Sequence, residues 1–353
     1  MQREKINDSM IYFDSDYMEG AHPEVMRRLM ETNLEHTVGY GEDPYSAHAR
    51  QLIRQACQAP DALVQFLIGG TQTNATVIDA LLRRHEGVLA AETGHINVHE
   101  SGAVEHSGHK VLTLPSHGGK VDAREVAEYI DTFYSDDTYP HMVAPGMLYI
   151  TQPTELGSIY SLAELEALSE VCHKHHIPLY LDGARLGYGL AAEGADFTLA
   201  DIARLCDVFY IGGTKVGALF GEAVVAPNPK RLPFFFELVK QHGALLAKGR
   251  LQGVQFETLF TNGLYQQIAR NAVELALHLR DAFMARGIRV AFPSPTNQQF
   301  FVLPNELMDK LREHASFENW GPRGDRETTV RFVTSWATTK EEVEQLIALL
   351  DRL

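Results

Sequence analysis

The sequence predicts an α/β fold with a mostly parallel central sheet, helices on both faces and a smaller C-terminal α+β domain. The first observation is that short runs of β-branched and aromatic residues alternate with longer segments of helical periodicity. The second is a change of pattern near residue 260, where a helical stretch precedes two strand-like pieces. The third is size, because 353 residues with 45% hydrophobic and 22% charged side chains suit one large domain plus a smaller one.

The central sheet is expected to contain seven strands joined mainly by helices, since repeated strand–helix units favour parallel pairing. The expected strands are 63–68, 88–91, 110–114, 147–151, 177–181, 208–211 and 222–226. The expected helices are about 44–58, 73–85, 122–132, 161–175 and 198–205.

The C-terminal part is expected to form its own α+β unit, so we predict a large domain over 1–259 and a small one over 260–353. An apolar stretch, 232–239, is expected to be a loop that is buried or faces another subunit. A polar stretch, 316–328, is also expected to be a loop. The C-terminal elements are a helical region at 250–285, strands at 288–292, 299–303 and 329–333, a helix at about 305–313 and a closing helix from Thr339.

Charge and cysteine content exclude several classes of protein. A net charge of −15 argues against binding a nucleic-acid backbone, which needs a basic face. Three cysteines without CxxC spacing indicate neither a disulfide framework nor a zinc site, and we expect them to be buried. Residues 1–13 lack a secretory pattern and no apolar run is long enough to span a membrane, so we expect a cytoplasmic protein.

A lysine and an aspartate at two strand ends indicate the chemistry. Lys215 follows the expected strand 208–211 and a Gly-Gly-Thr turn, and an amine in a partly apolar pocket can lose its proton and bond an aldehyde. Asp182 ends the expected strand 177–181 and shares a turn with Arg185. Since an acid for a pyridinium nitrogen and a lysine for an aldehyde carbon are what pyridoxal phosphate needs, the pair predicts that cofactor.

A glycine–threonine segment supplies a candidate phosphate site. Gly70, Thr71 and Gln72 follow a strand and open a helix, where backbone N–H groups bind anions. An ordinary turn explains the segment equally well when it is taken alone. Together with Lys215 and Asp182 it gives each part of the cofactor a partner at the carboxyl ends of the strands, where open α/β sheets bind ligands.

Three further side chains are expected at the same edge. His95 follows strand 88–91, where its ring can lie on a pyridine ring; its four-residue spacing from His99 is not an HExxH pattern, and we expect no metal site. Glu155 follows strand 147–151 and is a candidate base if burial raises its pKa, although a solvated loop glutamate is the alternative. Arg331 is a candidate for binding a substrate carboxylate, or else an ion-paired arginine.

Taken together, the motifs resemble those of the threonine aldolase and β-eliminating lyase group of fold-type I pyridoxal-phosphate enzymes. The resemblance covers nearly the whole chain and keeps the order of the family's motifs. These motifs are Asp14-Ser-Asp16, Gly39-Tyr-Gly-Glu-Asp-Pro44, Gly70-Thr-Gln-Thr-Asn74, His95 with Glu100-Ser-Gly102, Asp182-Gly-Ala-Arg185, Gly213-Thr-Lys215 and Arg331-Phe-Val-Thr-Ser335.

The resemblance implies an aspartate aminotransferase-like fold, a homo-oligomer (a dimer or a homotetramer) with shared sites, and an N-terminal segment, 1–20, at the active site. Lys215 would bond the cofactor aldehyde, Asp182 pair with the ring nitrogen and His95 stack on the ring. Gly70, Thr71 and Gln72 would hold the phosphate. Ser15, Arg185 and Arg331 would hold the substrate carboxylate, and Arg250 resembles an arginine that reaches a neighbour's phosphate.

Two departures from the best-known members concern the substrate end of the site. Tyr17-Met18-Glu19 replaces a Thr-Val-Thr segment, and Thr154-Glu155-Leu-Gly157 replaces a segment that carries a histidine. The base that acts on the substrate hydroxyl is therefore Glu155, His95 or a water between them.

The activity implied by the resemblance is retro-aldol cleavage of a β-hydroxy-α-amino acid, threonine or allo-threonine, to glycine and an aldehyde. The rival enzyme classes are a β-eliminating lyase and an aminotransferase on the same scaffold, which would form keto acids in place of glycine. A non-enzymatic cofactor-binding regulator is the remaining alternative, and the sequence carries no segment that resembles a DNA-binding module to support it.

Overall fold

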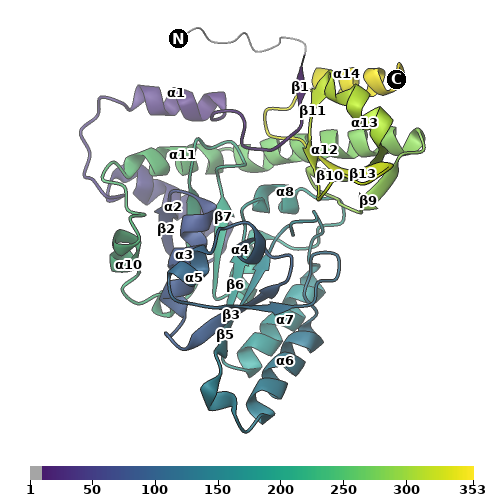
Figure 1. Ribbon diagram of the computed structural model, residues 1–353. Helices are drawn as coiled ribbons and strands as arrows, with labels where there is room; N and C mark the ends of the chain where they lie inside the picture. The colour runs from purple at the N-terminus through teal and green to yellow at the C-terminus, as the bar shows by residue number, and fades with distance from the viewer. Residues whose placement is uncertain (1–9) are drawn as a thin grey trace.

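The computed structural model describes residues 10–353. A seven-stranded sheet fills the centre of the molecule and a smaller sheet lies beside it (Figure 1). The expectation of no secretory signal concerns residues 1–13, most of which lie outside the described part. None of the helices within residues 10–353 combines the length and apolar character that a membrane crossing requires.

The large sheet has the order β2-β8-β7-β6-β5-β3-β4. Four of its strand pairs are parallel, and only β8 runs antiparallel to both of its neighbours. The predicted mostly parallel sheet is thereby confirmed, with each strand within about three residues of its expected position. Its strands are β2 (Leu63–Leu67), β3 (Glu86–Ala91), β4 (Val111–Leu114), β5 (Ala144–Thr151), β6 (Leu179–Asp182), β7 (Val208–Gly212) and β8 (Glu222–Ala226).

Helices cover both faces of this sheet, as predicted (Figure 1). Serine or threonine N-caps with an acid three residues later fix the starts of α7, α9 and α14 as capping boxes. The helices up to α9 are α1 (Pro23–Glu31), α2 (Pro44–Ala56), α3 (Gly70–Leu81), α4 (His95–Val98), α5 (Ala103–His106), α6 (Ala123–Ser135), α7 (Leu162–Lys174), α8 (Leu186–Leu190) and α9 (Leu199–Leu205). The later ones are α10 (Phe235–Gln241), α11 (Arg250–Phe260), α12 (Leu264–Ala285), α13 (Asn305–Arg312) and α14 (Lys340–Leu350).

Side chains alternate between the two faces even though the central strands are buried on both sides. In β5, Leu148 and Ile150 join the core formed with α2, α7 and α11, whereas Met147 and Tyr149 join the core formed with α3 and α10. The three cysteines are free and buried, as predicted.

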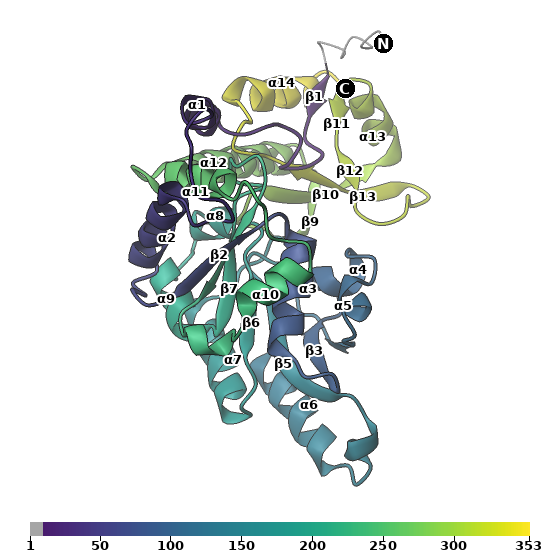
Figure 2. The same ribbon diagram turned by 90° about the vertical axis from the view of Figure 1, so that its left-hand side faces the viewer.

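A second, antiparallel sheet forms the C-terminal part of the chain, in the order β12-β13-β10-β9. Its core packs under α12, α13 and α14 and also takes in Ile11 and Phe13 from the start of the described chain. A short parallel pair, β1 with β11, joins the same region (Figure 2). The strands are β1 (Ile11–Tyr12), β9 (Arg289–Phe292), β10 (Gln298–Pro304), β11 (Ala315–Ser316), β12 (Glu318–Asn319) and β13 (Glu327–Val333).

Two stretches that were predicted to be loops contain regular structure. The helix α10 occupies much of 232–239, because Phe235 and Val239, four residues apart, share one buried helix face. The strand β12 lies within 316–328, where pairing with β13 supplies hydrogen bonds that the local sequence does not announce. The predicted domain boundary near 260 falls between α11 and α12 and remains a prediction.

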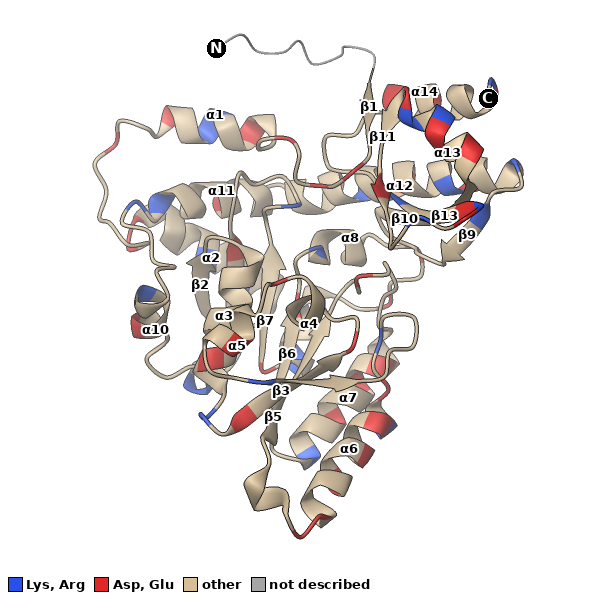
Figure 3. Cartoon of the chain, viewed as in Figure 1, with Lys and Arg blue, Asp and Glu red and all other residues tan. Residues whose placement is uncertain are grey.

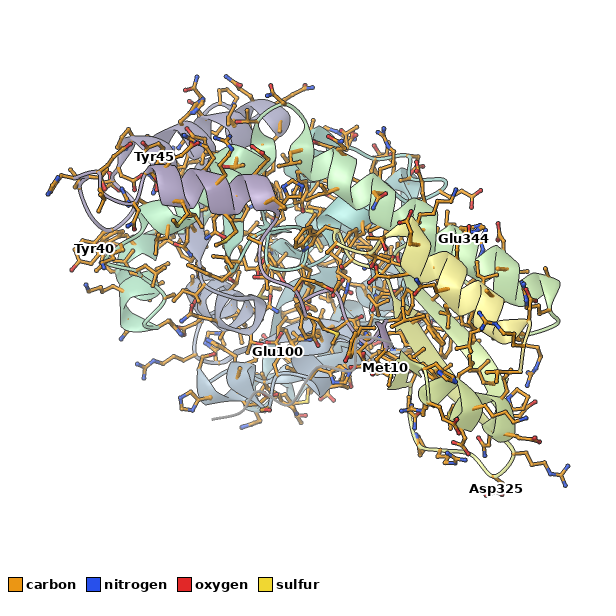
Figure 4. All side chains as sticks on the ribbon, turned by 90° about the horizontal axis from the view of Figure 1, so that it is seen from above. Met10, Tyr40, Tyr45, Glu100, Asp325 and Glu344 are labelled. Carbon is orange, nitrogen blue, oxygen red and sulfur yellow. The ribbon has the colours of Figure 1, made fainter. Side chains whose placement is uncertain are left out.

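Several of the acidic side chains lie on outer helices. Acidic residues mark α6, α7 and α14 (Figure 3), and most of them are exposed. In the view from above, Glu100 lies over the middle of the molecule, whereas Tyr40 and Asp325 mark opposite ends (Figure 4).

Candidate active site

The carboxyl ends of neighbouring parallel strands bring the predicted chemical groups to one cavity. Because β3, β5, β6 and β7 all run in the same direction, the segments that follow them meet at one edge of the sheet. A cavity that is partly open to solvent lies there. It is lined by Gly70, Asn74, His95, Glu100, Thr151, Pro153, Thr154, Glu155, Asp182, Ala184, Arg185, Tyr210 and Lys215.

Asp182 is held in one orientation by three hydrogen bonds. Asn74 Nδ2 donates to Oδ2 over 2.9 Å, and the Tyr149 hydroxyl donates to the same oxygen over 2.7 Å. The backbone N–H of Ala184 donates to Oδ1 over 2.9 Å. Since Asp182 is only 4% exposed, these donors stabilise a buried carboxylate that faces the cavity.

Lys215 lies three residues beyond β7 in a turn whose backbone is tightly held. Its carbonyl oxygen accepts a hydrogen bond from the Tyr188 hydroxyl at 2.6 Å. Its Nζ lies 6.0 Å from the centroid of the Tyr17 ring. Burial and the positive charge of Arg185 lower the pKa of the Lys215 amine, against the opposing charges of Asp16, Asp182 and Glu222. A lowered pKa increases the share of the unprotonated nitrogen, the form that attacks an aldehyde.

His95 is the first residue of α4 and is fixed by two carboxylates. Its Nδ1 lies 2.7 Å from Glu100 Oε1, and its backbone N–H donates to Glu155 Oε1 over 2.8 Å. Thr151 Oγ1 donates to the other oxygen of Glu155 over 3.1 Å. Burial raises the pKa of the Glu155 carboxyl to about 7, so this group can exchange a proton near neutral pH.

The two predicted carboxylate-binding arginines differ in position. Arg185 lines the cavity and makes a bidentate ion pair with Asp16, at 2.7 and 2.9 Å. Arg331 does not line the cavity; its Nη1 donates to Gln298 Oε1 over 2.9 Å and its Nη2 pairs with Glu318. The Arg331 Nε is buried and has no acceptor within residues 10–353, so this arginine can still accommodate an anionic group.

The predicted phosphate segment is divided between two hollows. Gly70 lines the cavity with Lys215, and a Cβ at this position would lie 3.2 Å from the Tyr210 hydroxyl oxygen. Thr71 and Gln72 line a neighbouring hollow that His242 also lines. Thr71 and Gln72 therefore do not line the cavity that holds the other predicted groups. Gly70, at the start of α3, does line it.

Two predicted residues lie outside the cavity lining. Ser15 is buried next to Asp16, but no described hydrogen bond joins its hydroxyl to the cavity. Arg250 begins α11 and donates from Nη1 to the carbonyl oxygen of Glu35 over 3.2 Å. Both assignments remain predictions.

The prediction from the residues gave no role to Asn74, Tyr149 and Glu100, which organise the site. Asn74 connects two acids, since its Nδ2 also donates to Glu100 Oε1 over 2.7 Å. Its spacing of four residues from Gly70 on α3 is the signal that places both on one helix face. Tyr149 lies within an apolar strand, where nothing in the sequence distinguishes an aspartate-binding hydroxyl from an ordinary core tyrosine.

The spacing of His95 and His99 does not build a metal site in the described structure. Their rings are 5.7 Å apart and tilted by 48°, and His95 Nδ1 is engaged by Glu100. Within residues 10–353, no group of three or more potential ligands is arranged to hold a metal ion.

The residues present fit pyridoxal phosphate. One cavity presents a lysine amine, a buried carboxylate and an imidazole, and the missing side chain of Gly70 leaves room beside the Tyr210 hydroxyl. Glu100 Oε2 is a buried oxygen without a partner in the described residues, although its other oxygen is bound by Asn74 and His95. Such a polar, incompletely satisfied cavity is typical of a binding site.

Comparisons with known proteins identify the family and the fold. The model of the β-eliminating lyase family matches residues 13–303. The low-specificity L-threonine aldolase of Pseudomonas sp. (strain NCIMB 10558) is 30% identical over 97% of this chain and 98% of its own. The structure of a threonine aldolase from Leishmania major is 40% identical, with a TM-score of 0.94 over 97% of this chain and 99% of its own. Aspartate aminotransferase from Thermus thermophilus, 16% identical, has the same fold with a TM-score of 0.70 over 98% and 91%. This chain belongs to the β-eliminating lyase family, whose members are pyridoxal-phosphate-dependent enzymes.

Proposed function

We propose that this protein is a threonine aldolase, a lyase that cleaves a β-hydroxy-α-amino acid between Cα and Cβ to give glycine and an aldehyde. Threonine and allo-threonine are the proposed substrates and pyridoxal phosphate is the proposed cofactor. The observation that carries the proposal is the meeting of Lys215, Asp182, His95 and Glu155, from four separate segments, in one cavity. The similarity to threonine aldolases over nearly the whole chain supports it.

Four groups would hold the cofactor. Lys215 would bond its aldehyde carbon, and the Asp182 carboxylate would hold the proton on its ring nitrogen. The His95 imidazole would lie on the ring, and the backbone at Gly70 would bind the phosphate at the start of α3. When bound, pyridoxal phosphate supplies an electron sink for the charge that develops at Cα.

The arginines would bind and orient the amino acid. Arg185 uses Nε and Nη2 to bond Asp16, and within the described residues its Nη1 has no hydrogen-bond partner. This nitrogen lies on a cavity-lining side chain and would bind the substrate α-carboxylate, assisted by Arg331 behind it. Fixing the carboxylate orients the Cα–Cβ bond relative to the base, which is a large part of catalysis by positioning.

Glu155 would remove the proton from the β-hydroxyl oxygen. Its carboxyl group lines the cavity, and burial raises its pKa to about 7, so it can accept a proton near neutral pH. His95 and a water between the two residues are the other bases that this geometry allows. After the bond breaks and the aldehyde leaves, the Lys215 amine would return a proton and release glycine.

Product identification tests the proposed reaction directly. Pure protein loaded with pyridoxal phosphate is incubated with threonine, allo-threonine, phenylserine and serine, and glycine, aldehydes and keto acids are measured. Glycine with an equal amount of aldehyde supports the aldolase. Keto acids in place of glycine identify a β-eliminating lyase or an aminotransferase, and no product from any of the four substrates rejects the proposal.

We also propose that the protein is a homo-oligomer with shared sites. Large apolar side chains near the start of the chain are exposed in the monomer, with Leu34 at 87% and Val38 at 66%. Clustered exposed apolar residues mark association surfaces. Arg250 does not line its own cavity and bonds the carbonyl oxygen of Glu35 in the same region, which suits contact with a neighbour.

Mixing two inactive variants tests the sharing of sites. If Arg250 serves the neighbour's site, Lys215→Ala and Arg250→Ala subunits that exchange should regain roughly a quarter of wild-type activity, because a mixed dimer then contains one intact site. Each variant alone provides the control. No recovery in mixed oligomers, verified by light scattering, would mean that Arg250 and Lys215 serve the site of the same subunit.

A further inference from the structure

The carboxyl group of Glu222 lies beneath the turn that carries Lys215. Glu222 is the first residue of β8, the one strand of the large sheet that runs antiparallel to its neighbours. The start of this strand therefore lies at the edge where the parallel strands end. In register, Glu222 is opposite Gly212, the last residue of β7, and opposite Leu67, the last residue of β2.

Neutral donors from the lysine turn bind this carboxyl group. Thr214 Oγ1 donates to Glu222 Oε1 over 2.9 Å, and the backbone N–H of Gly213 lies 3.3 Å from Oε2. The same threonine hydroxyl accepts from the backbone N–H of Gly221 over 2.9 Å. These bonds connect the residue that precedes Lys215 to the start of β8, so the position of Glu222 affects the position of the amine.

Burial makes the charge of Glu222 costly unless a positive charge balances it. The residue is 3% exposed, and its two donors are uncharged. Burial raises the pKa of Glu222 to about 8, against the opposing charge of Lys215. The charged groups that act on Lys215 in turn are Arg185, Asp16, Asp182 and Glu222. Of the three acids, Asp16 is bonded by the basic side chain of Arg185, and Asp182 is bonded by three donors. The donors to Glu222 are uncharged, so Glu222 has no basic hydrogen-bond partner.

We propose that Glu222 is a positioning residue for Lys215: its carboxyl group anchors the Gly213–Thr214 turn, and its negative charge favours a protonated Lys215 nitrogen. The inference rests on the proposed role of Lys215 as the aldehyde-binding amine.

A pH titration of the bound cofactor's visible absorbance tests the electrostatic role in the full-length, pyridoxal-phosphate-loaded protein. Glu222→Gln removes the negative charge while keeping an oxygen that can accept from Thr214. Because a nearby anion favours the protonated nitrogen, its loss should lower the titration midpoint by about one pH unit. Glu222→Asp keeps the charge and should return the midpoint toward that of the wild type.

Thr214→Val is the matched control for structure. It removes the hydrogen bond to Glu222 but leaves the charge, so its midpoint should stay within a few tenths of a pH unit of the wild type. A midpoint in Glu222→Gln that equals or exceeds the wild-type value overturns the proposal. An equal downward shift in Thr214→Val would do the same, since it would assign the effect to the turn alone.

A second measurement covers a variant that does not retain the cofactor. The pH dependence of Lys215 labelling by an amine-reactive reagent, followed by peptide mass spectrometry in the cofactor-free full-length chain, should show the same downward shift in Glu222→Gln. An unchanged labelling profile in a variant that melts at the wild-type temperature rejects the proposal. Neither readout needs substrate turnover, so failure of the aldolase assay leaves this test independent.

Discussion

The backbone N–H of His95 donates a hydrogen bond to Glu155 Oε1 over 2.8 Å, although the two residues follow different strands of the sheet. This bond joins the loop after β5 to the start of α4. It fixes the candidate base beside the imidazole proposed to lie on the cofactor ring.

The first prediction concerns the pH dependence of catalysis. With Glu155 as base and its pKa near 7, kcat/KM should rise as the pH increases through 7, because only the ionised carboxylate accepts a proton. Glu155→Gln should lower kcat by roughly 10²-fold and remove this rise. Steady-state assays between pH 5.5 and about 9 measure both. Thr151→Val is the control, because it removes a hydrogen bond to Glu155 but keeps the carboxyl group. An unaltered pH profile in Glu155→Gln would assign the role of the base to His95 or water.

The same raised pKa predicts a change in stability. A carboxyl group whose folded pKa lies above its unfolded value lowers the stability of the fold as the pH rises from the unfolded pKa to the folded one. Its cost is therefore absent at acid pH and complete above about 7. Glu155→Gln should therefore raise the melting temperature at alkaline pH and have little effect at acid pH. If the wild type and Glu155→Gln melted at the same temperature at both pH values, burial would not be the cause of the raised pKa.

Removal of the lysine amine should abolish covalent attachment of the cofactor. Lys215→Ala should lose the visible absorbance of lysine-bound cofactor and its turnover, while Lys174→Ala, on the exposed side of α7, should retain both. Absorbance spectra after gel filtration provide the measurement. Persistence of the wild-type spectrum in Lys215→Ala would disprove the central assignment.

Neutralisation of Asp182 should weaken cofactor binding. The buried carboxylate would no longer pair with a protonated ring nitrogen, and hydrogen bonds to charged groups contribute about 1.5–3 kcal/mol. Asp182→Asn should therefore lower the affinity for pyridoxal phosphate by roughly 10- to 100-fold. Tyr149→Phe, which removes one donor but keeps the charge, should have a smaller effect; a larger effect for the tyrosine would indicate that orientation outweighs charge. Equilibrium dialysis measures both affinities.

The ion pair between Asp16 and Arg185 should stabilise the fold. Burial opposes ionisation of Asp16, but the charges of Arg185 and Lys215 outweigh it and lower its pKa. Its contribution is therefore present above the ordinary aspartate pKa and lost as the pH falls through the lower folded value. Asp16→Asn should reduce the free energy of unfolding by about 3–5 kcal/mol near neutral pH, since Arg185 stays buried without its partner.

An exposed pair of the same type supplies the control for that comparison. Asp309 and Arg323 also form a bidentate pair, at 2.8 Å, but both side chains are about half exposed. Asp309→Asn should cost less than about 1 kcal/mol, and urea titrations of both variants measure the two costs. Equal costs for the two variants would show that burial of the Asp16 pair is not what makes it important.

The strand positions and the chemical groups at strand ends were predictable from the sequence because both depend on local patterns. Apolar runs identify β5 to β8; Asp182 is the last residue of β6, and Lys215 lies three residues beyond β7. The errors occurred where local pattern is weak. The helix α10 begins in an aromatic run, and β12 exists only because β13 lies beside it.

Packing between segments that are far apart in the sequence decided which side chains bond to one another. Gln72 and Arg331 were predicted on the basis of residue type, yet Gln72 turns into a neighbouring hollow and Arg331 pairs with Glu318. Asn74 bonds Asp182 across 108 residues of sequence, a contact that no spacing rule contains. Sequence pattern identifies a residue's type and its place in an element, whereas its hydrogen-bond partners depend on how the elements pack.

By itself, the sequence determined the α/β architecture, the lysine, the aspartate and the direction in which both face the ligand edge, because parallel strands place their carboxyl ends together. The tertiary structure alone decided which acids influence that lysine. Glu222 lies far from Asp182 along the chain, on an antiparallel strand. Only the register of β8 against β7 places its carboxyl group under the Lys215 turn. Electrostatic effects depend on distance in space and on burial, and neither is fixed until the sheet has assembled.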